Sequence, residues 1–244
     1  MNSEKVTPYK KSGENKREQI EQMFDNIAPK YDFLNRALSL GVDTIWRKQA
    51  IAKLKHKSPK IILDVATGTA DLALEAAKQL QPNKIVGIDI ADKMLSIGRK
   101  KIKNRHEQDI IELRQGDSTN LQFENNSFDA VMAAYGVRNF DDLKDGLKEM
   151  VRVLKPGGTL LVLEFSKPEK FPVKQLFNFY FRYILPNVGK LISKDNSAYE
   201  YLPQSVNVFP QGLAFINILK ELGLNNTEWV SQTFGISSIY TGTK

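Results

Sequence analysis

Residues 61–71 constrain the fold of this chain more than any other stretch. They read Ile-Ile-Leu-Asp-Val-Ala-Thr-Gly-Thr-Ala-Asp, which predicts a buried strand, a turn of small residues and the start of a helix. Residues 84–90 form a second apolar segment and carry an acid, Asp89, near its end. This arrangement is typical of the nucleotide-binding end of a doubly wound α/β sheet. The helix N-terminus offers unpaired N–H groups to a ligand, and Asp89 is placed to accept hydrogen bonds from ribose hydroxyls.

The pattern of small residues in this turn indicates which nucleotide binds. A P-loop needs a Gly-Lys-Ser/Thr ending and a dinucleotide fingerprint needs three glycines, whereas this turn contains only Gly68. The spacing Asp64-x-Ala66-x-Gly68-x-Ala70 resembles instead the D-x-G-x-G-x-G motif of S-adenosylmethionine (SAM) methyltransferases. Alanine replaces two of its glycines, which we expect to be tolerated if both positions have an ordinary, negative φ. We therefore predict SAM as the cofactor, and a strand-turn-helix without a ligand is the alternative.

Composition excludes several kinds of site. The chain of 244 residues contains no cysteine, so disulfides, thiolate metal sites and cysteine nucleophiles are absent. The two histidines, His56 and His106, lie near lysines in polar stretches, so we expect no metal. Neither an apolar leader nor a run of about 18 apolar residues is present, which favours a cytoplasmic protein.

The positive charge is concentrated at the start of the chain. The net charge is +7, and residues 1–60 hold 13 Lys/Arg against 7 Asp/Glu. Such a segment is suited to an anionic surface, so we predict peripheral association with the inner face of the membrane. A solvated, lysine-rich extension explains the same charge. We divide the chain into a basic helical extension or cap at 1–58 and a SAM-binding methyltransferase domain at 59–244.

Hydrophobic periodicity predicts the order of the elements. A first helix spans 14–27 and ends before Pro29, and a second begins at Asp43 as N-cap and runs to about Leu54. Beyond these two helices the pattern alternates between strands and helices, with strands at 60–65, 84–88, 110–114, 128–133 and 159–163. Such alternation predicts a parallel sheet with right-handed crossovers, which binds ligands at the carboxyl ends of its strands.

The last third of the chain departs from this rhythm. Residues 167–209 are rich in Phe and Tyr, and we predict a lid or substrate-pocket insertion there. A helix at 210–222 and two strands at 226–233 and 236–243 follow, which predicts an antiparallel hairpin at the sheet edge. The predicted fold is α/β, a mostly parallel sheet. The chain's resemblance to SAM methyltransferases at 64–70 implies their usual architecture, a seven-stranded sheet with a reversed last strand.

Two longer segments resemble a known family. Residues 152–166, Arg-Val-Leu-Lys-Pro-Gly-Gly-Thr-Leu-Leu-Val-Leu-Glu-Phe-Ser, closely resemble one signature of the menaquinone/ubiquinone biosynthesis C-methyltransferases of the UbiE/MenG type. The segment that begins Tyr31-Asp32-x-x-Asn35 and reaches Trp46 resembles the second signature. That signature usually has histidine where this chain has Asp43, which argues against an essential proton transfer at this position. Residues 136–139 and 199–202 also resemble the family. The resemblance implies a class I SAM-dependent methyltransferase (Rossmann-like) fold.

The resemblance also implies an activity and a set of site residues. The reaction is SAM-dependent C-methylation of a polyprenylated quinol, a lipophilic substrate. Arg138 is expected to stabilise a phenolate, Asn139 to orient the ring, and Tyr31 to add a hydrogen bond. The residues expected to contact SAM are Gly68, Thr69, Asp89, Asp117 and Ser118.

Other readings stay open at the level of sequence. The chain resembles no RNA-binding module, so we expect no nucleic-acid partner. The alternatives are an O- or N-methyltransferase of another small molecule, an RNA methyltransferase, and a subunit that binds SAM without turnover. The sequence does not distinguish a naphthoquinol (demethylmenaquinol) from a benzoquinol substrate, nor does it reveal the tail length, any general base or the oligomeric state, for which a homodimer is one option.

Overall fold

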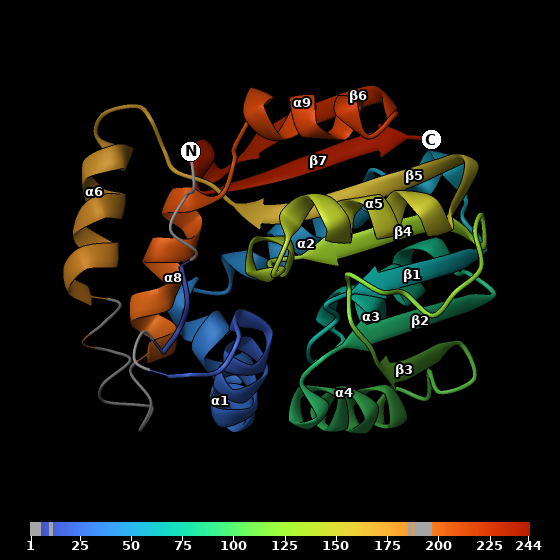
Figure 1. Ribbon diagram of the computed structural model, residues 1–244, viewed down its shortest axis with the longest axis horizontal. Coiled ribbons are helices and arrows are strands. Elements are labelled where there is room, and N and C mark those ends of the chain that lie inside the picture. Colours follow the sequence, from blue (N-terminus) through green and yellow to red (C-terminus); the bar gives the residue numbers. More distant parts are fainter. Residues whose placement is uncertain (1–5, 10–11, 185–186, 188–196) are drawn as a thin grey trace.

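A single seven-stranded sheet organises the chain in the computed structural model, which describes residues 6–9, 12–184, 187 and 197–244. The strand order is β3-β2-β1-β4-β5-β7-β6. The first five strands are parallel, whereas β7 pairs antiparallel with both β5 and β6 (Figure 1). The predicted α/β sheet with a reversed last strand is therefore confirmed. The strands are β1 Ile61–Val65, β2 Lys84–Asp89, β3 Ile111–Gln115, β4 Phe128–Ala134, β5 Leu154–Phe165, β6 Asn225–Gln232 and β7 Ser237–Thr243.

Helices cover both faces of the sheet and its carboxyl edge. The helices after the first two strands and after β4 are α3 Asp71–Leu80, α4 Asp92–Asn104 and α5 Leu143–Val153, and α9 Leu213–Glu221 precedes the final hairpin. At the edge, α1 Lys16–Leu38, α6 Val173–Phe179 and α8 Ser197–Val208 lie beyond the tips of β4 and β5 (Figure 1). The remaining elements are α2 Val42–Ala52, the π-helical η3 Tyr180–Ile184, and the short 3-10 turns η1 Lys55–Lys57, η2 Val137–Asn139 and η4 Thr233–Gly235.

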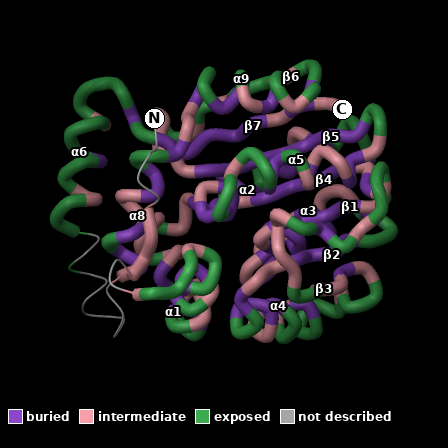
Figure 2. Tube along the Cα trace, in the orientation of Figure 1, coloured by how far each residue is buried: buried purple, intermediate pink, exposed green. Residues whose placement is uncertain are grey.

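The core has two layers, which follow from the alternation of side chains along each strand. In β1, Leu63 and Val65 pack with α5 and α9, whereas Ile62 faces the layer that contains α2 and α3. Figure 2 shows that the buried parts of the chain follow the strands and that α6 is largely exposed. Ile51, near the end of α2, and Leu54, which follows that helix, are fully buried. The end of the basic extension is therefore part of the core.

Helix α1 continues through the proline that was predicted to end it. Pro29 lies inside α1, so the prediction of a helix that stops before this residue is wrong. An internal proline costs a helix about 3 kcal/mol. Residues on both sides of it offset this cost, because Ile27 and Leu34 pack with α8, and Ala28 packs against α4. Tertiary burial overrides the local signal here.

The predicted helix starts also shift by one or two residues. Gly41, with φ of 77°, occupies the N-cap of α2, and Asp43 lies inside the first turn. The carboxylate of Asp43 does not cap the helix because it is held by Arg36, Arg47 and Ser39. Residues 155–158, whose sequence Lys-Pro-Gly-Gly predicts a turn before the strand, are included in β5, which begins at Leu154.

The segment between β5 and α9 contains α6, η3 and α8, as expected for an insertion. The sequence also predicts that Pro186 ends a helix of this segment, and that residue lies outside the described ranges. Across the described ranges, none of the helices combines the length and the apolar character needed to cross a bilayer.

Candidate functional site

A cavity of about 390 Å³ opens at the carboxyl ends of the strands. The tips of β1, β2 and β4 and the loop after β3 form its floor and one side, and the first half of α1 closes it with Ile20 and Phe24. Six of the eight predicted site residues line this cavity. They are Tyr31, Gly68, Asp89, Asp117, Ser118 and Asn139.

The turn after β1 adopts a left-handed conformation at all three small residues of the motif. The φ angles of Ala66, Gly68 and Ala70 are 55°, 55° and 64°. The expectation that the two alanines have ordinary φ is therefore wrong. Each alanine carries a strain of roughly 1 kcal/mol that glycine would avoid. The turn is held in this form because the Thr67 amide donates to the Ile88 carbonyl at 2.9 Å and the Gly68 amide donates to Asp89 at 2.8 Å.

Asp89 is fixed by backbone donors before any ligand arrives. Its Oδ2 accepts from the Gly68 amide, and its Oδ1 accepts from the Ala91 amide at 3.0 Å. Burial raises the pKa of Asp89 to about 6, although these backbone hydrogen bonds oppose the shift. A carboxylate has about four lone-pair positions, and the backbone amides of Gly68, Ala91 and Ile90 leave room for a further donor in the cavity.

Asp117 and Ser118 form the wall nearest β3. Oδ1 of Asp117 accepts from the Thr119 amide and hydroxyl, both at 2.8 Å. Its Oδ2 lies 3.0 Å from the guanidinium of Arg17, which comes from the first turn of α1. This ion pair joins the extension to the loop after β3, and no local pattern in the sequence predicts it.

Thr69 points away from the large cavity. Its hydroxyl donates to Asp32 at 2.6 Å and accepts from Lys101 at 3.1 Å. These groups belong to a buried network of alternating charges that joins α1, α2, α3 and α4. The network consists of Asp32, Arg36, Asp43, Arg47, Thr69, Asp71 and Lys101. Thr69 lines a second cavity of about 30 Å³, together with Tyr31 and Gly68.

Asp64 is a candidate that was not among the predicted site residues. It is fully buried in β1, lines the second cavity, and accepts from the Thr67 hydroxyl at 2.6 Å through Oδ2. Its Oδ1 has no hydrogen-bond partner among the described residues. Burial, with a contribution from the charge of Asp89, raises the pKa of Asp64 to about 7. The feature of the sequence that could have identified Asp64 as a site residue is an acid within an otherwise apolar strand.

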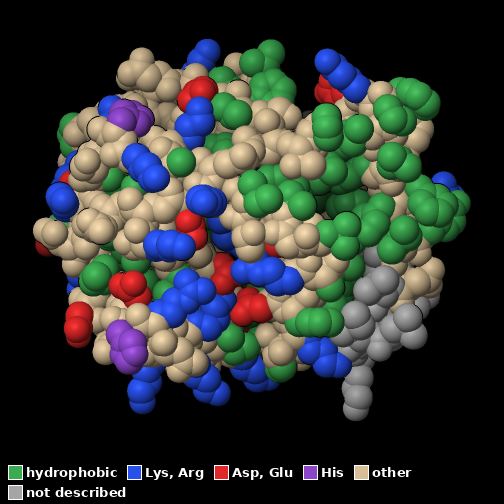
Figure 3. All heavy atoms as spheres, turned by 180° about the vertical axis from the view of Figure 1, so that it is seen from behind, with side chains coloured by type: hydrophobic (Ala, Val, Ile, Leu, Met, Phe, Trp, Pro, Cys, Tyr) green, Lys and Arg blue, Asp and Glu red, His purple; other side chains and the backbone are tan. Residues whose placement is uncertain are grey.

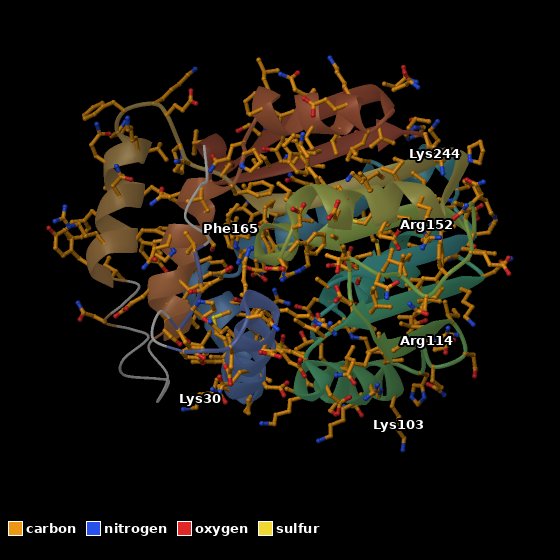
Figure 4. The ribbon with its side chains drawn as sticks, in the orientation of Figure 1. Lys30, Lys103, Arg114, Arg152, Phe165 and Lys244 are labelled. Carbon is orange, nitrogen blue, oxygen red and sulfur yellow. The ribbon has the colours of Figure 1, made fainter. Side chains whose placement is uncertain are left out.

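Arg138 lies behind the cavity wall and pairs with an acid that the sequence analysis had not linked to it. Its guanidinium is 2.7 Å from Glu164, which is fully buried at the tip of β5. It also donates to the Tyr135 carbonyl and lies 5.4 Å from the ring of Phe165, which Figure 4 labels at the end of β5. Its Nε is buried and has no partner among the described residues.

Asn139 and Tyr31 complete the side of the cavity nearest Arg138. The amide nitrogen of Asn139 donates to the Tyr135 carbonyl at 3.4 Å, while its Oδ1 is buried without a described partner. Burial raises the pKa of Tyr31, so its hydroxyl stays protonated near neutral pH and serves as a donor. The site thus presents unused polar atoms on two sides, near Asp64 and near Asn139.

Comparison with protein-family models matches residues 10–244 to the ubiE/COQ5 methyltransferase family. A demethylmenaquinone methyltransferase of Bacteroides fragilis is 49% identical over 241 residues, covering 99% of this chain and 98% of that protein. The ubiquinone/menaquinone biosynthesis C-methyltransferase UbiE of Geotalea daltonii is 45% identical over 230 residues, covering 94% and 97%.

Solved structures share the fold at low sequence identity. A SAM-dependent methyltransferase from Thermotoga maritima has a TM-score of 0.63 at 18% identity, covering 91% of this chain and 99% of that one. The [4+2]-cyclase SpnF has a TM-score of 0.59 at 19% identity, covering 93% and 96%. Because one of these proteins is named as a cyclase, the fold by itself does not identify the reaction.

Proposed function

The chain belongs to the ubiE/COQ5 methyltransferase family, and on this premise we propose that it transfers the methyl group of SAM to a ring carbon of a polyprenylated quinol. Demethylmenaquinol is the substrate we favour, since the Bacteroides fragilis relative is named for it. The observation that carries the proposal is the cavity at the strand tips, which places Asp89 and Asp117 at one end and Asn139 at the other.

The residues present fit SAM. Asp89 has room to accept from a ribose hydroxyl, and the Ser118 backbone offers an N–H to a ring nitrogen beside Asp117. The unpartnered Oδ1 of Asp64 is suited to an ammonium group near Gly68 and Thr69. When bound, SAM supplies a methyl group that is already activated by its sulfonium.

The chain's own residues then favour attack by carbon. A phenol has a pKa of about 10, and loss of its proton makes the ring carbon more nucleophilic. The positive charge of the Arg138 guanidinium, which lies behind the cavity wall, favours the negative charge that develops on a ring oxygen. Glu164 holds the guanidinium plane at 2.7 Å, while Asn139 and Tyr31 position the ring. Helix α1 excludes water above them.

We propose that the two parts of the chain share this work. Residues 1–58 act as the cap, since Ile20 and Phe24 of α1 line the cavity that 59–244 builds. Within the insertion at 167–209, we assign the substrate pocket to α8, because Tyr199 and Tyr201 pack against the same helix, and α6 lies outside that pocket. We place the enzyme in the cytoplasm, peripheral at the inner face of the membrane, and a homodimer stays an option that sedimentation velocity tests.

Product analysis tests the proposed reaction. The purified chain is incubated with SAM and, separately, with short-tailed demethylmenaquinol and the demethylated benzoquinol, and products are identified by mass. A methyl group that survives acid and ether cleavage is bonded to carbon. A cleavable methyl group, or SAM binding without product, would contradict C-methylation and support an O-methyltransferase or a non-catalytic subunit respectively.

A further inference from the structure

The outer side of the α6–η3 segment presents large apolar side chains to solvent. Phe171, Leu176, Phe179 and Tyr183 are 79%, 64%, 56% and 52% exposed. Positions 176, 179 and 183 are three and four residues apart, the spacing of one side of a helix. A soluble surface rarely keeps so many large apolar groups together without a binding role.

These side chains are not needed to hold the segment in place. Its inner side does that, because Phe177 is buried and stacks on Phe181 with ring centroids 4.1 Å apart. The Tyr180 hydroxyl donates to the Leu38 carbonyl at the end of α1 at 2.9 Å. The exposed row can therefore be changed without removing the contacts that anchor α6 and η3.

Neighbouring segments add exposed apolar groups at the same end of the molecule. Leu40, which follows α1, is 89% exposed, and Phe234 in η4 is 81% exposed. Tyr180 links η3 to the end of α1, and Gly235 lies close to Pro168, at the start of the insertion. Figure 3 shows hydrophobic side chains gathered over this side of the molecule.

Basic residues flank this apolar surface. Residues 167–184 contain four Lys/Arg, at 167, 170, 174 and 182, against the single acid Glu169. All four basic residues are exposed. Apolar groups that enter the acyl boundary, surrounded by cations that meet phosphate groups, match the surface of an anionic bilayer.

The basic extension is less suited to this role than its composition suggested. Arg17 pairs with Asp117, and the Lys16 ammonium donates to the Phe140 carbonyl at 2.6 Å. Arg36 and Arg47 belong to the buried charge network. These three arginines, of the 13 basic residues counted in 1–60, are therefore paired with carboxylates of the protein, and Lys16 is held by a backbone carbonyl.

We propose that the exposed face of α6–η3, with Lys170 and Lys174, is the surface that docks this enzyme on an anionic phospholipid leaflet. This inference rests on the proposed function, because a polyprenylated quinol resides in the membrane. Docking here places lipid next to the insertion through which the substrate would enter.

Vesicle sedimentation tests the apolar part of the surface. With vesicles of phosphatidylcholine and phosphatidylglycerol, the double variant Leu176→Ser/Phe179→Ser should lower the partition coefficient at least about tenfold. The matched control is Gln175→Ser/Asn178→Ser, which changes two exposed polar residues of the same helix. The control should bind as the unchanged chain does. Equal binding by the Leu176/Phe179 variant would overturn the proposal.

A second pair of variants tests the charge. Lys170→Glu/Lys174→Glu should abolish the preference for phosphatidylglycerol, and high salt should do the same to the unchanged chain. Lys100→Glu/Lys103→Glu makes the same charge change on α4, where Lys103 projects away from the body (Figure 4), and should have little effect. Similar losses from both pairs would show a general charge effect and overturn the assignment to α6.

Turnover separates this inference from the proposed reaction. The α6 variants should keep their turnover of a short-tailed, water-soluble quinol and lose turnover of a long-tailed quinol held in vesicles. Loss of both reactions, with an unchanged circular dichroism melt, would contradict a docking role. If the unchanged chain methylates neither quinol, the proposed function fails, while vesicle binding still tests the surface. If the unchanged chain is a dimer that binds no lipid, and the Leu176/Phe179 variant is a monomer, the face would be assigned to contact with a second copy of the chain instead.

Discussion

At the scale of single residues, the two alanines of the turn after β1 hold an unfavourable backbone conformation. Ala66 and Ala70 have positive φ angles, as Gly68 does, yet glycine occupies only one of the three positions. An L-residue with a side chain costs roughly 1 kcal/mol more than glycine in this region. The fold tolerates this cost because the turn positions Asp89 and the floor of the cavity.

Ala66→Gly should therefore stabilise the protein, by up to about 1 kcal/mol, since it releases this strain. Urea unfolding measures the change. Ala77→Gly, inside α3, is the matched control and should destabilise by about 1 kcal/mol or more, because glycine adds flexibility to the helix and removes a buried methyl group. A loss of stability in Ala66→Gly would show that the methyl contact with Gly136 outweighs the strain.

Arg138 combines a structural and a chemical role, and a paired variant separates them. Arg138→Ala leaves Glu164 buried without its cation, which should destabilise the fold by roughly 3–5 kcal/mol. Arg138→Ala/Glu164→Gln removes the unpaired charge and should recover much of this loss. Turnover should nevertheless stay lower by orders of magnitude while SAM affinity changes little. Thermal melts, calorimetry with SAM and product formation provide the three readouts, and recovered turnover in the double variant would remove Arg138 from the mechanism.

At the scale of elements, the buried charge network determines how the extension sits on the domain. Asp43 accepts from Arg36 of α1 and from Arg47 of α2, and Arg36 also reaches Asp71 of α3 at 2.9 Å. The first two helices therefore meet α3 through ion pairs as well as through apolar packing. The aspartate at the position where the family signature has histidine is thus part of the support for α1.

Asp43→Ala should destabilise the protein by roughly 3–5 kcal/mol, because Arg47 is nearly buried and would lose its nearest carboxylate. Chemical denaturation measures this cost. Glu221→Ala breaks an exposed pair with Lys144 on the far side of the sheet and should change little. An equally small effect of Asp43→Ala would mean that Asp71, 3.9 Å from Arg47, compensates for the loss.

At the scale of the whole molecule, two sets of carboxylates give stability opposite dependences on pH. Burial raises the pKa of Asp89 to about 6 and that of Asp64 to about 7, so the folded state holds protons that the unfolded chain has lost. Their contribution is fully present at low pH and declines as pH rises through 6 and 7. The pKa of Asp71 is lowered despite its burial, because Arg47 and Lys101 favour its charged form. Its contribution is lost as pH falls through its lowered pKa.

The melting temperature of the ligand-free protein should therefore be highest at about pH 4, fall between about pH 4 and pH 7, and change little above that. Asp64→Asn should reduce this fall, because the group that resists ionisation is gone. SAM should bind more tightly as pH rises from 5 to 8, since an ionised Asp64 is suited to an ammonium group. Scanning calorimetry and titration across this range measure both effects, and a melting temperature that rises steadily to pH 8 would contradict the assignment of these groups.

Patterns among residues close in the sequence were enough to predict the strands and their order along the chain, and to recognise the two family signatures. Alternation of apolar residues and a helix start after Gly68 are local properties, so the sheet followed from them, whereas the reversed last strand and the cluster of six site residues followed from the resemblance to the family. Long-range contacts decided the rest. These contacts keep α1 helical through Pro29 and hold Ala66 and Ala70 at positive φ angles. They also pair Arg138 with Glu164, which is 26 positions away in the sequence. The physical reason is that burial energy and the desolvation of charge depend on partners distant in sequence, and these partners are defined only once the sheet and its helices have packed together.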